Sequence, residues 1–140
     1  MTAYDSDNIF ARILRGEIPA HKVYEDTAAL AMMDIFPQSR GHLLVIPKAP
    51  SRNLLDADPA VLAATMPLVQ RLARAAVSAT GADGVRVAQF NEPPAGQTVF
   101  HLHFHIIPVY DGMELGRHGG GRADDGELAT LARAIAAAVV

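Results

Sequence analysis

The chain contains no cysteine and no long apolar run, and each absence excludes a class of protein. Without a thiol among its 140 residues, it forms neither disulfides nor thiolate metal sites, which fits a reducing compartment. No apolar stretch approaches the ~20 residues that a membrane helix needs. The polar, acidic residues 1–8 do not resemble a secretory signal. We therefore expect a cytoplasmic protein that has no membrane partner.

The chain also lacks a strong charge of either sign. Its net charge is −3 and its pI is about 6.0, which argues against an electrostatic partnership with nucleic acid. Half of its residues are apolar, enough to build a core in a chain of this length. No repeat or internal boundary divides the sequence, so we expect a single domain over residues 1–140.

Hydrophobic periodicity predicts an α+β fold with an antiparallel or mixed sheet. Asp58 before Pro59 is typical of a helix start, as is Asp124 with Glu127 three positions later, and Ser6 or Asp7 is the expected cap of the first helix. Residues 111–123 hold five glycines and are expected to form a mobile loop. The expected helices cover about 7–15, 58–78 and 124 onwards, and the expected strands cover 22–25, 28–34, 43–47, 85–90 and 98–109.

Three of the six histidines alternate along the last expected strand, at His101, His103 and His105. Side chains alternate across a strand, so these three imidazoles should leave the same face. An isolated histidine is more often an ordinary core or surface residue, and we interpret His21 and His118 in that way. A row of three is poorly explained by packing alone and predicts a functional site.

A shared metal ion is one interpretation of this row. The Cα atoms of His101 and His105 would lie about 13 Å apart at ~3.3 Å per residue. Zinc–nitrogen bonds are only about 2.0–2.1 Å long, so converging all three rings on one ion would strain the strand. Two of the histidines with a distant third ligand remain an alternative.

Nucleophilic catalysis is the other interpretation. A neutral imidazole attacks phosphorus well when one ring nitrogen is free and a carbonyl or second imidazole holds the other. Its neighbours can then donate to phosphate oxygens or to the leaving group. Gly96, Gln97 and Thr98 precede the row with a close backbone approach, an amide and a hydroxyl, which suit phosphate oxygens. Activity should then fall as the pH drops through the imidazole range.

Residues 96–107 resemble the signature of the histidine triad family, in which His-x-His-x-His is followed by two apolar residues. Residues 8–26 resemble the family's N-terminal helix and first strand, and residues 34–48 resemble its central block. The resemblance spans roughly residues 7–110. It implies a HIT-like fold, a five-stranded antiparallel sheet with two main helices, here followed by a C-terminal helix. It also implies a homodimer whose sheets join across the subunits.

The activity that the resemblance implies is nucleotidyl transfer to water. His103 would attack the α-phosphate of a purine nucleotide conjugate, and water would release AMP or GMP from the nucleotidyl-histidine. His101 would support the row, and His42 would lie close to it. The residues implied to contact the nucleotide are Asp34 at the ribose hydroxyls, Ile35 in the nucleoside pocket, and Asn91, Gln97, Thr98 and His105 around the phosphate.

The chain departs from the family pattern at several positions. Many bacterial members form a zinc site from Cys-x-x-Cys and a later histidine, but Asn8, Ala11 and Pro50 occupy those positions here. We therefore expect neither a bound metal nor another cofactor. Val109 stands where relatives often carry arginine, which removes a cation near the phosphates. His105 replaces the glutamine of the sugar-phosphate transferase branch and favours hydrolysis.

The longer matching blocks favour the phosphoramidase-like, Hint-type bacterial branch, whose members cleave purine nucleoside phosphoramidates. Residues 94–99 are also similar to the dinucleoside polyphosphate hydrolase branch. That hydrolase, and a non-enzymatic purine nucleotide-binding or adaptor protein on the same fold, are the alternatives.

Overall fold

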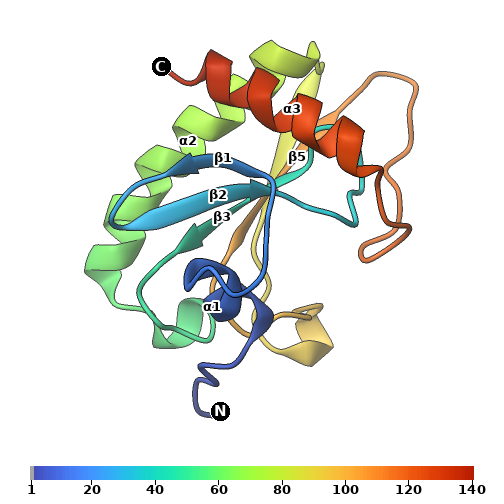
Figure 1. Ribbon diagram of the computed structural model, residues 1–140. Helices are drawn as coiled ribbons and strands as arrows, with labels where there is room; N and C mark the ends of the chain where they lie inside the picture. Colours follow the sequence, from blue (N-terminus) through green and yellow to red (C-terminus); the bar gives the residue numbers. More distant parts are fainter. Residues whose placement is uncertain (1) are drawn as a thin grey trace.

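The computed structural model describes residues 2–140 and places five strands in one antiparallel sheet of order β1-β2-β3-β5-β4 (Figure 1). The expected HIT-like α+β fold is therefore confirmed. The strands are β1 (Lys22–Glu25), β2 (Ala29–Met33), β3 (Leu43–Pro47), β4 (Gly84–Ala88) and β5 (Phe104–Val109). The helices are α1 (Ile9–Leu14), α2 (Pro59–Thr80) and α3 (Asp125–Ala138), with the short 3-10 turns η1 (Leu54–Asp56) and η2 (Pro93–Ala95).

The two faces of the sheet are covered unequally. On one face, alternate strand residues such as Ala31 and Val45 pack into the core that α2 and α3 share. On the other, Leu30 and Leu44 pack against the short helix α1. Figure 1 shows α3 and α1 on opposite sides of the strands β1 to β3. Because α1 has only one and a half turns, the sheet face beneath it is left partly open, and this is the face that His105 shares.

Local side chains set the helix starts. Asp58 caps α2 by accepting a hydrogen bond from the Ala60 amide at 2.8 Å, and Asp124 caps α3 by accepting from the Glu127 amide at 3.0 Å, as expected. The cap of α1 is Asn8 rather than Ser6 or Asp7, because its side chain accepts from the Ala11 amide at 2.9 Å. One of the absent zinc-ligand positions therefore serves as a helix cap.

The last strand is shorter than expected, beginning at Phe104 and not at residue 98. Its pairing with β3 ends where Phe104 opposes Val45, and continuing it would bring Leu102 opposite Pro47, which has no N–H to donate. The Leu102 amide instead donates to the Ser51 carbonyl at 2.9 Å. His101 and His103 thus precede the strand, although the rings of His103 and His105 still lie 5.0 Å apart between centroids.

Helix α2 qualifies the expectation that no segment is apolar enough to span a membrane. By length and composition alone it is long and apolar enough to do so. The core helices of soluble proteins are often as long and as apolar. The buried face of α2 packs into the core shared with the sheet and α3, and it includes Leu68, Leu72 and Ala76.

Gly41 fixes the approach of the chain to β3. Its φ is +93°, which L side chains rarely adopt, and a Cβ there would lie 2.8 Å from Thr80 Cγ2 and 3.2 Å from Pro108 Cγ. Only glycine lets the chain pass between the end of α2 and β5 and then place His42 at the start of β3.

We expect Gly41→Ala to lower the free energy of unfolding by roughly 1–3 kcal/mol, because strain and contact add at this position. Urea denaturation measures the change. Gly84→Ala is the matched control, since its φ is not positive and no atom lies within 4 Å of the added Cβ. An equal effect of the two substitutions would contradict this account of Gly41.

Candidate functional site

A cavity of about 190 Å³ opens on the α1 side of the sheet. Apolar side chains from α1, β2 and β3 form much of its wall, and the imidazoles of His103, His105 and His118 line it side by side. The expected site residues that line it are Asp34, Ile35, Thr98, His103 and His105. The expected residues His42, His101, Asn91 and Gln97 are not among the lining residues.

His103 is held in one tautomer by the backbone. Its Nδ1 lies 2.6 Å from the carbonyl oxygen of His101, and because a carbonyl only accepts, Nδ1 carries the proton. In the neutral ring Nε2 then keeps its lone pair. Burial lowers the pKa of His103 to about 4, so the neutral form persists well below the usual imidazole range. The edge of Phe10 packs against the ring at 4.9 Å between centroids.

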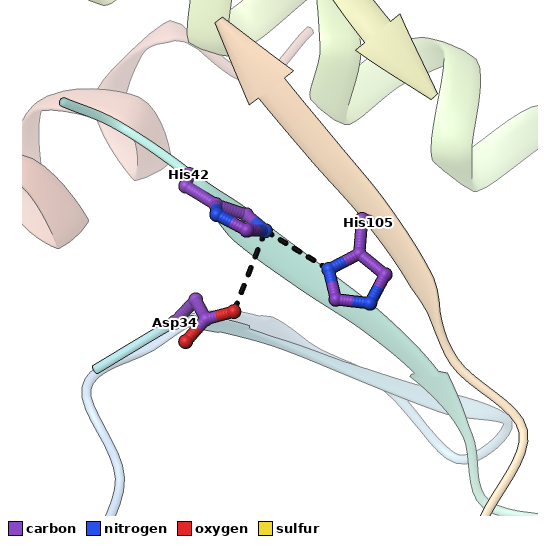
Figure 2. Close-up of side chains that lie close together, drawn as sticks. All are labelled: Asp34, His42 and His105. Atoms are coloured by element: carbon purple, nitrogen blue, oxygen red, sulfur yellow. Dashed lines mark hydrogen bonds and ion pairs between the residues drawn. The ribbon is translucent and has the colours of Figure 1, made fainter. Parts of the chain in front are cut away.

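His42 and His105 form a hydrogen-bonded pair with a fixed direction (Figure 2). The Gln38 amide donates to His42 Nδ1 at 3.0 Å, so the proton of the neutral His42 ring must sit on Nε2. That proton is donated to His105 Nδ1 at 2.9 Å, which leaves the His105 proton on Nε2. Burial lowers the pKa of His42 to about 4 and also lowers the pKa of His105. Both rings are therefore neutral at physiological pH.

The far end of this pair is unsatisfied. His105 Nε2 is buried and has no hydrogen-bond partner within residues 2–140, while its side chain lines the cavity. A buried donor without a partner is costly, by about 1–3 kcal/mol, and is compensated when a ligand supplies the acceptor. The chain of hydrogen bonds from Gln38 through His42 therefore ends in an N–H that is available to an anionic or carbonyl oxygen.

Asp34 lies beside the hydrogen-bonded pair of His42 and His105. One carboxylate oxygen accepts from the Phe36 amide at 2.8 Å, and the other lies 3.4 Å from His42 Nε2. Burial raises the pKa of Asp34, against the lowering effect of the Phe36 hydrogen bond. Because His42 is neutral, its contact with Asp34 is a polar contact and not an ion pair.

Asp34, His42 and His105 also resemble a metal-ligand set, since their ligand atoms lie within 4.8 Å of one another. The fit fails on protonation. A metal would need the lone pair of His42 Nε2, but the Gln38 N–H occupies Nδ1 and requires the proton to stay on Nε2. Metal binding would therefore break that backbone hydrogen bond, and the geometry favours the proton over the ion.

His101 is committed to the protein on both ring nitrogens. Nε2 donates to the Pro47 carbonyl at 2.7 Å, and Nδ1 accepts from the Tyr4 hydroxyl at 2.7 Å. Its ring does not line the cavity, while its carbonyl holds His103. The supporting role of His101 stays a prediction, and no pattern in the sequence indicates its partner Tyr4.

The amides of Asn91 and Gln97 are also engaged within the protein. Asn91 accepts from the Leu54 amide at 2.9 Å and ties its loop to η1. The buried Gln97 amide makes four hydrogen bonds, to Glu92 N, Asn53 Nδ2, Arg52 O and Val99 O. These bonds hold the loop that presents Thr98. Contact of either amide with a phosphate stays a prediction.

Two rings at the site were not identified from the sequence. Phe90 packs against His105 at 5.5 Å between centroids, and His118 lies 5.4 Å from the same ring. His118, which we interpreted as an ordinary residue, lines the cavity because the glycine-rich segment folds back over the site. No periodicity in residues 111–123 signals that return. His21 does fit the ordinary interpretation, since it hydrogen-bonds Asp125 at 2.9 Å, outside the cavity.

Comparisons with known proteins agree with the fold. A family model described as the HIT domain matches residues 15–112. A solved HIT-like protein involved in cell-cycle regulation from Bartonella henselae is 50% identical, with a TM-score of 0.92 over 98% of this chain and 100% of that one. A zinc-bound histidine triad family protein from Mycobacterium smegmatis is 38% identical, with a TM-score of 0.83 over 94% and 92%.

A curated relative carries an enzyme name. The protein named adenylylsulfatase HINT3 from Arabidopsis thaliana is 43% identical over 103 residues, which cover 74% of this chain. The match covers 52% of that protein, so the chain spans about half of its length.

Burial of neutral imidazoles predicts acid sensitivity of the fold. Between the unfolded imidazole pKa of about 6.5 and the folded values near 4, the unfolded chain binds protons that the folded protein does not. The free energy of unfolding should therefore fall as the pH drops from 6.5 towards 4. Calorimetric melting temperatures at pH 7.5, 6 and 5 measure this decline. The His105→Gln variant, with one buried imidazole fewer, should decline less steeply, and an identical slope would contradict the assignment.

Proposed function

This chain belongs to the HIT family, and on that premise we propose that it hydrolyses purine nucleoside phosphoramidates or related nucleotide conjugates at the α-phosphate. A nucleotide hydrolase-like activity is what the family relationship supports in general, and the substrate and the intermediate are our proposal. The observation that carries it is the state of His103, whose Nδ1 proton is held by a carbonyl while Nε2 keeps its lone pair beside the cavity.

The proposed reaction has two displacement steps. In the first, His103 Nε2 forms a bond to the α-phosphorus, and the bond from phosphorus to the leaving group breaks with its electron pair on the leaving group. In the second, water attacks the nucleotidyl-histidine and the N–P bond breaks, which restores the neutral ring. Over both steps water supplies the oxygen of the nucleoside monophosphate and the proton of the departed group.

His105 is suited to the charge that develops on phosphorus. Its partnerless Nε2–H is the end of a hydrogen-bond chain that starts at a backbone amide, so it cannot easily reverse into an acceptor. Donors fixed in advance stabilise a transition state without reorganising during the reaction. We assign His105 to a phosphate oxygen, His42 to the orientation of His105, and His101 to the support of His103. Thr98, which also lines the cavity, can donate its hydroxyl to the same phosphate.

The nucleoside half of the substrate is assigned to the apolar end of the cavity. A purine ring would lie among side chains that include Phe10, Ile18 and Ile35. The carboxylate of Asp34, which lines the cavity and contacts His42, is a suitable acceptor for two ribose hydroxyls.

The leaving group is the least constrained part of the substrate. No lysine or arginine lines the cavity in the described part of the chain, which is unfavourable for a long polyphosphate and disfavours a dinucleoside polyphosphate substrate. A small leaving group, as in a phosphoramidate, fits better. The name of the adenylylsulfatase relative points to another nucleotide conjugate with a small leaving group. These considerations support the phosphoramidase-like, Hint-type branch, and we propose that the chain acts in the cytoplasm and needs no cofactor.

We also propose that two copies form a homodimer through β4. The sheet order puts β4 at an edge, and its Val85 and Val87 are 36% and 48% exposed. An edge strand with exposed apolar side chains is a liability unless another strand or chain covers it. If β4 paired with β4 of a second copy, each strand would cover the exposed edge of the other.

His103→Ala should lower the release of AMP from adenosine 5′-phosphoramidate by roughly 10³-fold or more, because the nucleophile is gone. Chromatographic assay of AMP measures the rate, and mass spectrometry of acid-quenched wild-type protein should detect nucleotidylated His103. The His21→Ala control, which removes an imidazole outside the cavity, should retain the wild-type rate.

Two results would refute the proposed function. One is AMP release that His103→Ala leaves unchanged. The other is wild-type protein that binds AMP and yet never releases it from phosphoramidates, adenylyl sulfate or diadenosine polyphosphates, which would favour the non-enzymatic alternative.

Val87→Lys should convert the dimer to a monomer, since it would place two like charges at the paired edge strands. Light scattering after size exclusion measures the mass. Met113→Lys is the control, because Met113 is 68% exposed and lies outside β4. A monomeric wild-type protein, or a Val87→Lys variant that remains dimeric, would rule out this interface.

A further inference from the structure

The phosphate end of the cavity lacks a permanent positive charge. Its ionisable lining residues are Asp34, His103, His105 and His118, and neither lysine nor arginine is among the lining residues within positions 2–140. His103 and His105 are the neutral rings described above. A nucleotide phosphate entering this end would thus meet hydrogen-bond donors, a nearby carboxylate and a single further imidazole, that of His118.

His118 is placed at the cavity wall by two ring contacts. Its centroid lies 5.4 Å from that of His105 at an interplanar angle of 68°, and 5.6 Å from that of Phe90 at 69°. Both contacts are edge-on packing, and they use none of the hydrogen-bonding capacity of the ring nitrogens. Both His118 and Gly119 line the cavity, while the His118 side chain also remains open to solvent.

The segment that carries His118 is anchored to the residue that orients His42. The Gly116 amide donates to the Gln38 carbonyl at 2.7 Å, and the Gln38 side-chain amide donates back to the Gly116 carbonyl at 3.1 Å. The backbone amide of Gln38 is the donor that sets the His42 tautomer. Further along, the Ala123 amide donates to the carbonyl of Ile35, the neighbour of Asp34, at 2.9 Å. The segment is therefore fastened to the site on both sides of His118.

A tight turn includes His118. The Gly120 amide donates to the Arg117 carbonyl at 3.1 Å, and Gly119 adopts a φ of +68°. A Cβ on Gly120 would lie only 3.1 Å from that carbonyl oxygen. The glycines following His118 thus permit a turn that bulkier residues would open.

We propose that His118 is a substrate-binding residue, which donates a hydrogen bond from its imidazole to a phosphate oxygen of the bound nucleotide. The proposal rests on the proposed function only in taking the occupant of the cavity to be a nucleotide. An imidazole N–H is a suitable donor to a phosphate oxygen, which is a charged acceptor. His118 would thereby add a hydrogen-bond donor to the phosphate contacts, and the glycine-rich segment would be part of the binding site.

Calorimetric titration with AMP and with adenosine separates a phosphate contact from packing. We expect His118→Ala and His118→Phe each to weaken AMP binding by roughly tenfold or more, as loss of a hydrogen bond to a charged group does. Both variants should bind adenosine within about twofold of wild type, because adenosine has no phosphate. His118→Phe keeps a ring against Phe90 and His105, so it isolates the donor from the packing. Arg117→Ala, which removes a permanent charge next to His118, is the control and should bind AMP normally.

Three outcomes would overturn the assignment. The first is that His118→Phe binds AMP as tightly as wild type. The second is that the His118 variants lose affinity for adenosine as much as for AMP. The third is that Arg117→Ala weakens AMP binding equally, which would indicate a general electrostatic effect of the segment. The result is independent of the catalytic proposal. A wild-type protein that binds AMP through His118 but never forms nucleotidyl-His103 would sustain this inference and refute the proposed function.

Discussion

Backbone groups that can play only one hydrogen-bonding role determine the protonation of the whole site. A carbonyl oxygen only accepts, so the His101 carbonyl fixes the proton of His103 on Nδ1 and leaves Nε2 with a lone pair. An amide only donates, so Gln38 fixes the proton of His42 on Nε2, and His42 in turn fixes that of His105. Two adjacent imidazoles thereby receive opposite characters, His103 as a base and His105 as a donor. Neutral imidazoles in solution exchange tautomers freely and show no such division.

Burial is what makes this arrangement effective. If His42 or His105 took up a proton, its acceptor nitrogen Nδ1 would become a donor. The chain of hydrogen bonds from Gln38 to His105 would then break at that nitrogen. Desolvation lowers the pKa of all four clustered imidazoles, His42, His101, His103 and His105, and so excludes the doubly protonated form near neutral pH. The same burial makes the fold more sensitive to acid. The nucleophile and the acid sensitivity of the protein therefore have one physical origin.

The fold and the central site residues could be predicted from the sequence because their signals are local. Alternation placed His103 and His105 on one face, and Asp58 and Asp124 marked the helix starts. The missed features depend on segments distant in the chain. Strand β5 begins late because its partner β3 ends at a proline, and the Gln97 amide is engaged by Arg52 and Asn53, over 40 positions away. His118 reaches the site through turns in a segment without periodicity, so no pattern around it announces its position.

The unequal cover of the sheet explains why the site formed on the α1 side. Helices α2 and α3 close the opposite face with continuous apolar packing, where a buried imidazole would find few partners. The short α1 leaves room for a cavity, and loops from three places in the chain enter that space with their backbone donors and acceptors. Gln38 belongs to the first of these loops and the His101 carbonyl to the second. The third is the glycine-rich segment. This segment is hydrogen-bonded to Gln38, and the Gln38 amide is the donor that orients His42. A displacement of the segment would therefore disturb that hydrogen bond. A single residue, Gln38, is therefore hydrogen-bonded both to this segment and to the ring that sets the tautomer of His105.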